Sequence, residues 1–241
     1  MKLHPTPSLT DAVYRTIRAD LLACRIPPGA RLKIAELAKD TGSSLGAVRE
    51  ALSRLTSEGL VVAEPQKGFR AAPISAEELI DLTDVRIQIE TMCLRRSIAA
   101  GDLHWETEVL VSNHTLLRTP RMDPSDPGVV SEEWAAAHHR FHEATVAACD
   151  SPKLLQIREQ LYAQSERYRR LSVPLAESDR DLEGEHKALT EALLARDADA
   201  ACAAVTDHLH ETTRILLEAQ AKVLKTLSPE RSATRLLAEV R

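Results

Sequence analysis

The stretch SLGAVREALSRLTSEGL, residues 44–60, decides how the first part of the chain folds. Ser44 is a helix-capping residue type, and apolar residues then recur three and four positions apart as far as Gly59. This spacing predicts an amphipathic helix whose buried face carries Val48, Ala51, Leu52 and Leu55. A shorter helix is predicted at about 34–40, and Gly42-Ser43 forms a tight turn between the two. Two short helices joined by a brief turn that contains glycine are typical of a helix-turn-helix.

The sequence on either side of these helices completes a small domain. An amphipathic helix is predicted over residues 9–24, and Pro27-Pro28-Gly29 ends it. Residues 60–63 and 69–71 are short strand candidates, which would form a β-hairpin wing with a basic tip. The sequence therefore predicts a winged helix-turn-helix, made of three helices and the wing, over residues 1–72.

Beyond Pro73 the pattern indicates a second, mainly α domain. The predicted helices span about 76–100, 103–118, 131–149, 152–171, 179–195 and 198 into the low 220s. The Pro/Asp/Gly-rich residues 119–128 form the one long loop, and no second strand pattern is present. We therefore expect residues 73–222 to form an antiparallel all-helical bundle of about six helices. Residues 223–241 are expected to be a partly disordered tail.

Capping residues mark where these helices begin. Ser75 with Glu78 is a capping box, and Ile74 with Leu79 is a hydrophobic staple beside it. Ser8 is expected to cap the first helix of the chain. The N-caps of later helices are expected at Ser131, Ser151, Ser178 and Asp197.

Charge is distributed unevenly along the chain. The 241 residues have a net charge of −5, yet residues 1–72 contain 11 lysines and arginines against 7 acidic residues. Residues 73–241 contain 20 against 29. A basic first segment and an acidic second one indicate that the first segment meets a polyanion.

The composition excludes several other classes of protein. Hydrophobic residues make up 44% and aromatic residues 3%, which favours a helical globular protein. No apolar run approaches the roughly 18 residues that a membrane span needs, and the start of the chain lacks the apolar core of a signal peptide. The four cysteines show neither CxxC spacing nor the density of a disulfide scaffold. We therefore expect a cytoplasmic protein with no membrane partner.

The second helix of a helix-turn-helix enters the major groove and contacts DNA with its N-terminal residues. The expected DNA-binding residues are those of this helix and its two neighbours: Lys33, Ser44, Leu45, Gly46, Ala47, Arg49, Arg54 and Lys67. Arg49 and Arg54, taken singly, could equally be solvated surface charges. Together with the turn, the wing and the charge asymmetry, they favour DNA binding.

Four longer motifs resemble the winged helix of the GntR family of transcriptional regulators. They are PGARL at 28–32, VREALSRL at 48–55, EGLV at 58–61 and KGFR at 67–70. The helices that follow resemble the FCD effector domain of the FadR-type subfamily, so that the resemblance covers about residues 10–218. It implies a homodimeric repressor that binds a palindromic operator and responds to a small organic acid. Where family members often carry Ser-Arg-Thr-Pro, this chain has Ser44-Leu45-Gly46-Ala47, which suggests weaker base readout.

The histidines of the second domain are a candidate metal site. His138 and His142 are four residues apart and project from one helical face, while His186 and His208 belong to later helices. A bundle can bring such residues together in its interior, where four neutral imidazoles suit a transition metal. The alternative is that each is a hydrogen-bonded core histidine, which is the commoner role of a single buried histidine.

The family resemblance adds to this hypothesis. FCD domains often bind a divalent metal with an Asp, a His on the same helix and one His on each of two later helices, and His138 stands in the place of the Asp. Imidazole in place of carboxylate favours Zn²⁺ or Ni²⁺, which would anchor a small carboxylate effector such as a dicarboxylate or hydroxy acid. Arg86 matches an arginine that often faces the family's cavity; its other possible role is to pair with Glu90.

Two functions are alternatives to a DNA-binding regulator. Histidine-ligated zinc could serve a metallo-hydrolase with an appended helical domain. Glu143 and Glu185 adjoin the candidate ligands in sequence but are expected to point away from them, which leaves no general base. A purely structural bundle would, like the hydrolase, leave the basic winged domain unexplained. The sequence therefore favours a DNA-binding regulator that is not an enzyme.

Overall fold

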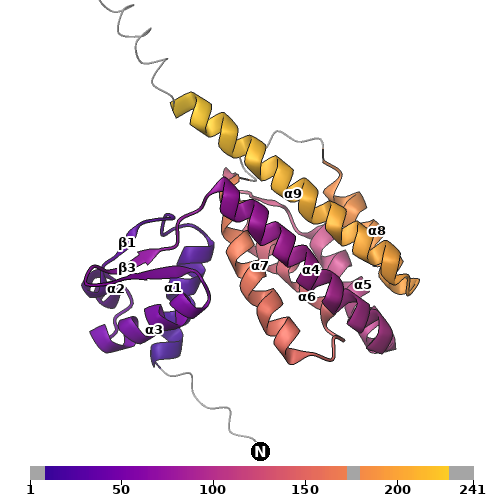
Figure 1. Cartoon of the computed structure of the whole chain (residues 1–241), viewed down its shortest axis with the longest axis horizontal. Helices are drawn as coiled ribbons and strands as arrows, with labels where there is room; N and C mark the ends of the chain where they lie inside the picture. The colour runs from indigo at the N-terminus through magenta and orange to yellow at the C-terminus, as the bar shows by residue number, and fades with distance from the viewer. Residues whose placement is uncertain (1–8, 173–179, 228–241) are drawn as a thin grey trace, which may run out of the picture.

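The computed structural model describes residues 9–172 and 180–227. The N-terminal part lies beside a larger helical part (Figure 1). Its helices are α1 (Leu9–Leu22), α2 (Ile34–Asp40) and α3 (Leu45–Ser57). Its antiparallel sheet has the order β1-β3-β2 and consists of β1 (Arg31–Leu32), β2 (Val61–Glu64) and β3 (Gly68–Ala71). The predicted winged helix-turn-helix is confirmed.

Local signals explain how α2 and α3 are joined. Gly42 has a φ of 61° in the turn, a left-handed conformation that glycine adopts without steric cost. The Oγ of Ser44 accepts a hydrogen bond from the amide of Ala47 at 3.2 Å and caps α3, as predicted. The core of this domain is formed by Val13, Ile17 and Leu21 of α1 with Val48, Ala51, Leu52 and Leu55 of α3.

Two details of the N-terminal domain differ from the prediction. Helix α1 ends at Leu22 rather than at 24, and Cys24 has a left-handed φ of 54°. Strand β1 was not predicted, because two residues are too few to show an alternating pattern, and it is defined by its pairing with β3. The wing strands lie within one residue of their expected bounds.

The helical part contains six helices among the described residues: α4 (Ala76–Ala100), α5 (Leu103–Arg118), α6 (Glu132–Val146), α7 (Pro152–Ser172), α8 (Leu182–Leu194) and α9 (Ala198–Leu227). Helix α4 packs against α7 and α9, α5 packs against α6, and α8 packs against α9 (Figure 1). The predicted bundle is confirmed. Helix α9 continues to Leu227, beyond the expected boundary at 222, and residues 228–241 of the expected tail lie outside the described residues.

The predicted loop over 119–128 is wrong in one respect. It contains a short antiparallel hairpin of β4 (Met122–Asp123) and β5 (Asp126–Val130), so this domain is not entirely helical. Asp123 stabilises the turn, because its Oδ1 accepts hydrogen bonds from the amide and the hydroxyl of Ser125. The strands are short and rich in turn-forming residues, which concealed them in the sequence.

Most of the predicted N-caps are present in the structure. Ser75 and Ser131 each accept an amide hydrogen bond as N-caps, and Ser151 and Asp197 accept amides at the starts of α7 and α9. The Ser75 capping box is half formed, since the Glu78 carboxylate accepts from the Tyr168 hydroxyl instead of the Ser75 amide. Asp181 caps α8. Ser8 and Ser178 lie outside the described residues.

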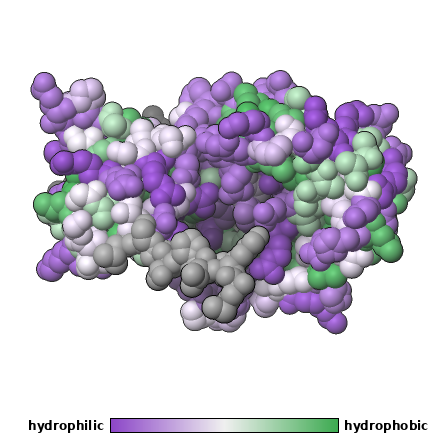
Figure 2. Space-filling model, turned by 90° about the horizontal axis from the view of Figure 1, so that it is seen from below, coloured by the Kyte–Doolittle hydropathy of each residue, from purple (hydrophilic) through white to green (hydrophobic). Residues whose placement is uncertain are grey.

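The two parts of the chain contact each other mainly through α1 and α7. Arg18 of α1 pairs with Glu58 at 2.9 Å and with Glu159 of α7 at 3.2 Å. The amide of Gln164 donates to the backbone carbonyl of Glu58 at 3.0 Å. The surface is hollowed between the two parts, and most side chains around the hollow are hydrophilic (Figure 2). Polar contacts therefore join the domains.

Candidate metal centre and DNA-binding face

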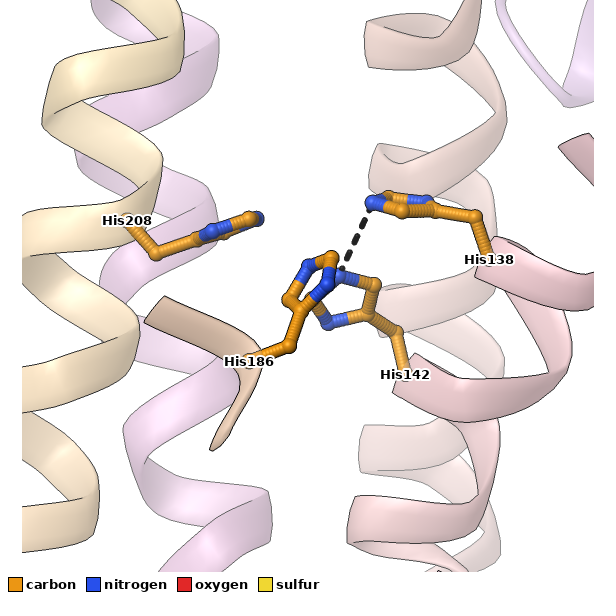
Figure 3. Close-up of side chains that lie close together, drawn as sticks. All are labelled: His138, His142, His186 and His208. Carbon is orange, nitrogen blue, oxygen red and sulfur yellow. Dashed lines mark hydrogen bonds between the residues drawn. The ribbon is translucent and has the colours of Figure 1, made fainter. Parts of the chain in front are cut away.

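The four histidines predicted as ligands lie together inside the helical domain. His138 and His142 are one turn apart on α6, and His186 of α8 and His208 of α9 point toward them (Figure 3). One ring nitrogen of each lies within 4.8 Å of those of the other three, and the Nε2 atoms of His138 and His142 are 3.2 Å apart. All four side chains are buried.

Burial keeps these imidazoles uncharged. It lowers the pKa of His138 and of His142 well below the ordinary value, and neighbouring cations lower both further. Burial also lowers the pKa of His208, and it lowers that of His186 to about 2. At neutral pH each ring therefore has a free lone pair, which is the form that binds a metal ion.

Two side chains outside the cluster orient its rings. The Tyr162 hydroxyl lies 3.1 Å from Nδ1 of His138, and Glu185 accepts from Nδ1 of His208 at 2.8 Å. Each contact occupies Nδ1 and leaves Nε2 to face the cluster. Although burial raises the pKa of Glu185, hydrogen bonds from Arg180 and His208 lower it to about 2, so the carboxylate is ionised.

The expectation that Glu185 points away from the histidines is therefore wrong. Its backbone position, adjacent to His186, does place it on another side of α8, but its side chain reaches His208 on α9. A carboxylate that accepts from the outer nitrogen of a ligand histidine fixes the tautomer and makes the ring a better donor.

The cluster fits a transition metal ion. Zn²⁺ binds histidine nitrogen at about 2.0–2.1 Å, which places tetrahedral ligand atoms about 3.3 Å apart. The 3.2 Å between His138 and His142 matches this, and the widest separation of 4.8 Å needs a small inward movement. The Nε2 of His186 is buried and has no hydrogen-bond partner among the described residues. This orphaned atom is hard to reconcile with a cluster of merely hydrogen-bonded core histidines.

A cavity adjoins the cluster and is lined by His138, Tyr162 and His208 together with several arginines. Arg86 is one of them, and it also pairs with Glu90 at 3.3 Å, so both roles considered for it coexist. The Glu90 carboxylate binds Arg158 at 2.8 Å as well, and Arg158 donates to the backbone carbonyl of His142. Arg86 is thus held in place beside the candidate metal site.

The expected DNA-binding residues lie mainly at the surface of the N-terminal domain. Ser44, Gly46 and Arg49 are exposed at the start of α3, Ala47 is half-buried, and Leu45 is 57% exposed. Lys67 is exposed in the turn of the wing, and Lys33 is exposed at the start of α2.

Two of these cations already have partners. Lys33 forms an exposed ion pair with Glu36 at 2.8 Å, which costs little to break. Arg54 is held more firmly, because it pairs with Asp11 at 2.7 Å and lies over the ring of Tyr14 at 4.0 Å. Arg54 would have to exchange these contacts to reach a phosphate, whereas Arg49 would not.

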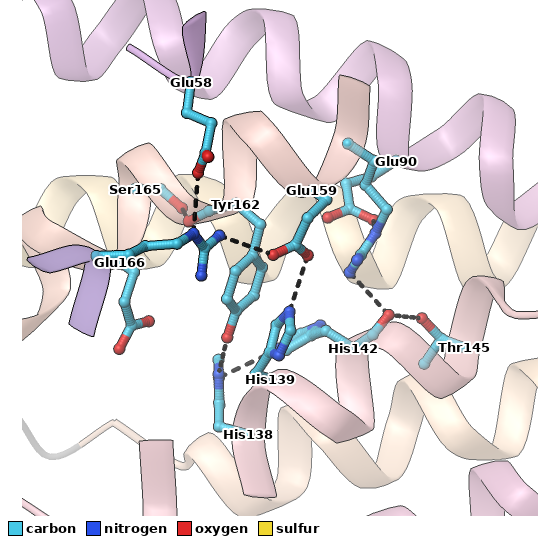
Figure 4. A network of polar contacts seen from close by, with 12 residues as sticks. Glu58, Glu90, His138, His139, His142, Thr145, Glu159, Tyr162, Ser165 and Glu166 are labelled. Carbon is cyan, nitrogen blue, oxygen red and sulfur yellow. Dashed lines mark hydrogen bonds and ion pairs between the residues drawn. The ribbon is translucent and has the colours of Figure 1, made fainter. Parts of the chain in front are cut away.

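Polar contacts run from the N-terminal domain toward the histidines. Glu58 and Glu159 flank Arg18, Glu159 accepts from His139 at 2.9 Å, and Tyr162 on the same helix contacts His138 (Figure 4). Helix α7 therefore touches both the DNA-binding domain and the candidate metal centre.

Sequence reasoning did not identify Tyr162, Arg121, Arg169 or Arg180 as site residues. Arg180 donates to both Glu185 and the backbone carbonyl of His208, and all four line the cavity. All four lie outside the helices that carry the histidines, and no local spacing relates them to the histidines. The one available signal was the number of arginines in an otherwise acidic domain.

Comparison with known proteins gives the family. Residues 9–70 match the family described as bacterial regulatory proteins, gntR family, and residues 81–211 match the FCD domain. The HTH-type transcriptional regulator BphR of Paraburkholderia xenovorans (strain LB400) is 36% identical over 87% of this chain and 85% of its own length. The HTH-type transcriptional repressor GlaR of Escherichia coli (strain K12) is 36% identical over 86% of this chain and 96% of its own length.

A solved structure supports the same fold. That of E. coli McbR/YncC has a TM-score of 0.72 at 22% sequence identity and covers 88% of this chain and 99% of its own. The part of the chain that is described has no helix long and apolar enough to cross a membrane. The chain belongs to the gntR family of bacterial regulatory proteins and carries an FCD domain, so it is a DNA-binding transcriptional regulator and not the hydrolase considered above.

Proposed function

We propose that this regulator is a cytoplasmic homodimeric repressor whose affinity for a palindromic operator is lowered by a small carboxylate bound beside a Zn²⁺ or Ni²⁺ ion. The observation that carries the proposal is the set of four buried, uncharged imidazoles next to an arginine-lined cavity. A dicarboxylate or a hydroxy acid suits such a cavity.

His138, His142, His186 and His208 would hold the ion, and Glu185 and Tyr162 would fix two of the rings. A set of four nitrogen ligands without a carboxylate favours Zn²⁺ or Ni²⁺ over Mg²⁺ or Mn²⁺. Once bound, the ion supplies a Lewis acid for an effector carboxylate. Arg86, held by Glu90 and by Ser165 at 2.8 Å, would bind the effector from the cavity wall.

DNA binding is assigned to residues 1–72, and effector binding and dimerisation to residues 73–222, followed by a tail over 223–241. Contacts with the operator are assigned to the start of α3, to Lys33 and to Lys67, with Arg54 the weakest candidate because of its partner Asp11. The net positive charge of this domain would attract it to DNA of any sequence. The uncharged start of α3 leaves Arg49 as its main side chain for base or phosphate contacts.

Effector binding would act on DNA binding through α7. A ligand shifts a conformational equilibrium when its affinities for the two states differ. Tyr162 contacts a metal-site histidine, and Glu159, one helical turn earlier, contacts Arg18 of the DNA-binding domain. A movement of α7 at the effector site would therefore alter the placement of α1, and with it the spacing of the two recognition helices in a dimer.

The test is a mobility-shift titration of the full chain, loaded with Zn²⁺ or Ni²⁺, on DNA from its own promoter region. We expect retardation at low salt, weakened by small dicarboxylates or hydroxy acids, and no response to the acid after chelation. DNA of random sequence and equal length is the control. Absence of retardation at low salt would contradict operator binding, and the same acid response with and without metal would contradict the effector site.

A further inference from the structure

Four arginines line the cavity beside the histidines: Arg86, Arg121, Arg169 and Arg180. Three of them bind glutamates, since Arg86 pairs with Glu90, Arg169 with Glu166 and Arg180 with Glu185. These glutamates are shared, because Glu90 also binds Arg158 and Glu166 also binds Arg170. The cavity wall therefore carries more positive than negative charge before any metal ion is added.

Arg121 contributes to this excess without a counter-ion among the described residues. It lies between α5 and β4, and no ion pair or hydrogen bond of its guanidinium with another described residue is present. Its Nε is buried without a partner, and its guanidinium lies 5.8 Å from the centre of the Trp134 ring. Burial lowers the pKa of Arg121, and Arg180 and Arg169 lower it further.

Arg169 presents a second unsatisfied group against the same ring. Its side chain is buried, its guanidinium lies 5.1 Å from the centre of Trp134, and its Nη1 has no partner among the described residues. A buried guanidinium N–H without an acceptor is costly. A water molecule could accept these hydrogen bonds, but it would leave the positive charge of Arg121 uncompensated.

We infer that Arg121 and Arg169 form a subsite for a second carboxylate of the effector, whose first carboxylate lies at the metal. The inference rests on the proposed function and narrows its effector to a dicarboxylate. The planar guanidinium fork matches a carboxylate, and the same cavity is lined by His138 and His208. The enclosed space is small, about 40 Å³, so a dicarboxylate would extend into the wider neighbouring cavity that Arg121 also lines.

A neighbouring cavity shows where the ligand would enter. It has a volume of about 580 Å³ and shares Arg121, Trp134 and Arg180 with the first. Arg121 thus lies where the enclosed space beside the histidines meets the wider one. A dicarboxylate that enters through the wider cavity meets Arg121 before it reaches the metal.

The test is calorimetric titration of the Zn²⁺-loaded full chain with straight-chain dicarboxylates of four to six carbons and with monocarboxylates of the same lengths. We expect at least one dicarboxylate to bind about tenfold or more tightly than its matched monocarboxylate. Arg121→Gln should weaken binding of that dicarboxylate about 10- to 100-fold and leave monocarboxylate affinity unchanged. Arg121→Lys, which keeps the charge without the fork, should give an intermediate affinity.

Arg118→Gln is the matched control, because Arg118 is exposed and lines only the wider of the two cavities. It should leave both affinities unchanged. Equal affinities for a dicarboxylate and its matched monocarboxylate would overturn the subsite. So would an equal loss of affinity for the two acids in Arg121→Gln protein of normal metal content. Neither result would contradict the metal-dependent response of DNA binding to the acid. Binding of neither acid class would overturn the proposed effector as well. If Arg121→Gln protein does not fold, unchanged dicarboxylate affinity in Arg121→Lys overturns the subsite.

Discussion

The DNA-binding face and the histidine site place their polar side chains in opposite surroundings. Arg49 and Lys67 are exposed, so water satisfies them and packing does not restrict them. His138 and His186 are buried, and every nitrogen there needs a partner from the protein or from a ligand. A polar atom without a hydrogen-bond partner in the protein therefore points to a ligand at the buried histidine site. At the exposed DNA-binding face it does not, because water can be its partner.

This contrast explains why the two regions support different kinds of conclusion. At the DNA-binding face, the fold and the charge indicate the partner, while the identity of single contacts stays a prediction. At the histidine site, Nε2 of His186 and Nε of Arg121 are buried without a hydrogen-bond partner among the described residues, so each supports a specific proposal about a ligand.

Removal of one histidine should have the largest effect. His142→Ala should weaken Zn²⁺ binding about a hundredfold or more, because structural zinc sites supply roughly 10–16 kcal/mol through four ligands. Metal content after dialysis, measured by elemental analysis, checks this. His139→Ala is the control, since His139 lies on the same helix but contacts Glu159 rather than the cluster. Full metal content in the His142→Ala protein would show that the ligand assignment is wrong.

Acid should destabilise the metal-free protein next most strongly. The histidine pKa values are near 6.5 in the unfolded chain and lower in the folded one, so the unfolded state binds more protons below pH 6.5. Stability should be full above pH 6.5 and fall as the pH drops, down to about 2 for His186. Between pH 7.5 and 5.5 we expect His186, whose folded pKa is about 2, to contribute a loss of about 1 kcal/mol, and the other three to act in the same direction.

Chemical denaturation of the chelated protein at a series of pH values measures this loss. Saturating Zn²⁺ should raise the stability but leave the slope near pH 6.5 largely unchanged, because the four rings bind few protons in the folded chain with or without the ion. A stability that does not change between pH 7.5 and 5.5 would mean that the four rings remain accessible to protons in the folded state.

Loss of the carboxylate behind His208 should have a smaller effect. Glu185→Gln should weaken metal binding about 10- to 100-fold, the range seen when groups that orient metal ligands are changed. Competition with a chromophoric chelator measures it. Glu191→Gln on the same helix is the control, because Glu191 forms an exposed and long pair with Lys187. Equal affinities for the two variants would remove Glu185 from the site.

The smallest effect is expected at the exposed face. Arg49→Ala should weaken operator binding about tenfold without a change in thermal stability, because Arg49 is exposed and its side chain forms no ion pair or hydrogen bond with another described residue. Arg140→Ala, an exposed arginine of the helical domain, is the control for loss of charge. Mobility-shift titration at fixed salt compares the two, and an unchanged affinity for Arg49→Ala would place the DNA elsewhere.

Much of the fold could be predicted because its signals are local. Helix α5 spans Leu103–Arg118 as its spacing indicated, and Ser44 and Ser131 cap the helices that they were expected to cap. The hairpin of β4 and β5 was missed, because strands of two and five residues are defined by pairing across the turn. Arg54 was assigned to DNA from its place on α3, and the sequence had no means of showing Asp11 and Tyr14 beside it.

In the candidate site, too, some residues could be predicted from the sequence and others could not. Helical phase relates His138 to His142 within one helix, and the family resemblance identified His186 and His208. No pattern along the chain could show that Glu185 reaches His208 or that Tyr162 contacts His138, because these pairs are 23 and 24 residues apart on different helices.

The sequence by itself determined the helices, the winged DNA-binding domain and the four candidate ligands, since periodicity, capping and residue chemistry act over a few neighbouring positions. The tertiary structure alone decided which polar groups are satisfied. Burial and partnership depend on the packing of α6, α7, α8 and α9 against one another. Among the described residues, that packing left Nε2 of His186 and Nε of Arg121 without hydrogen-bond partners, and the proposed metal and acid sites rest on these two atoms.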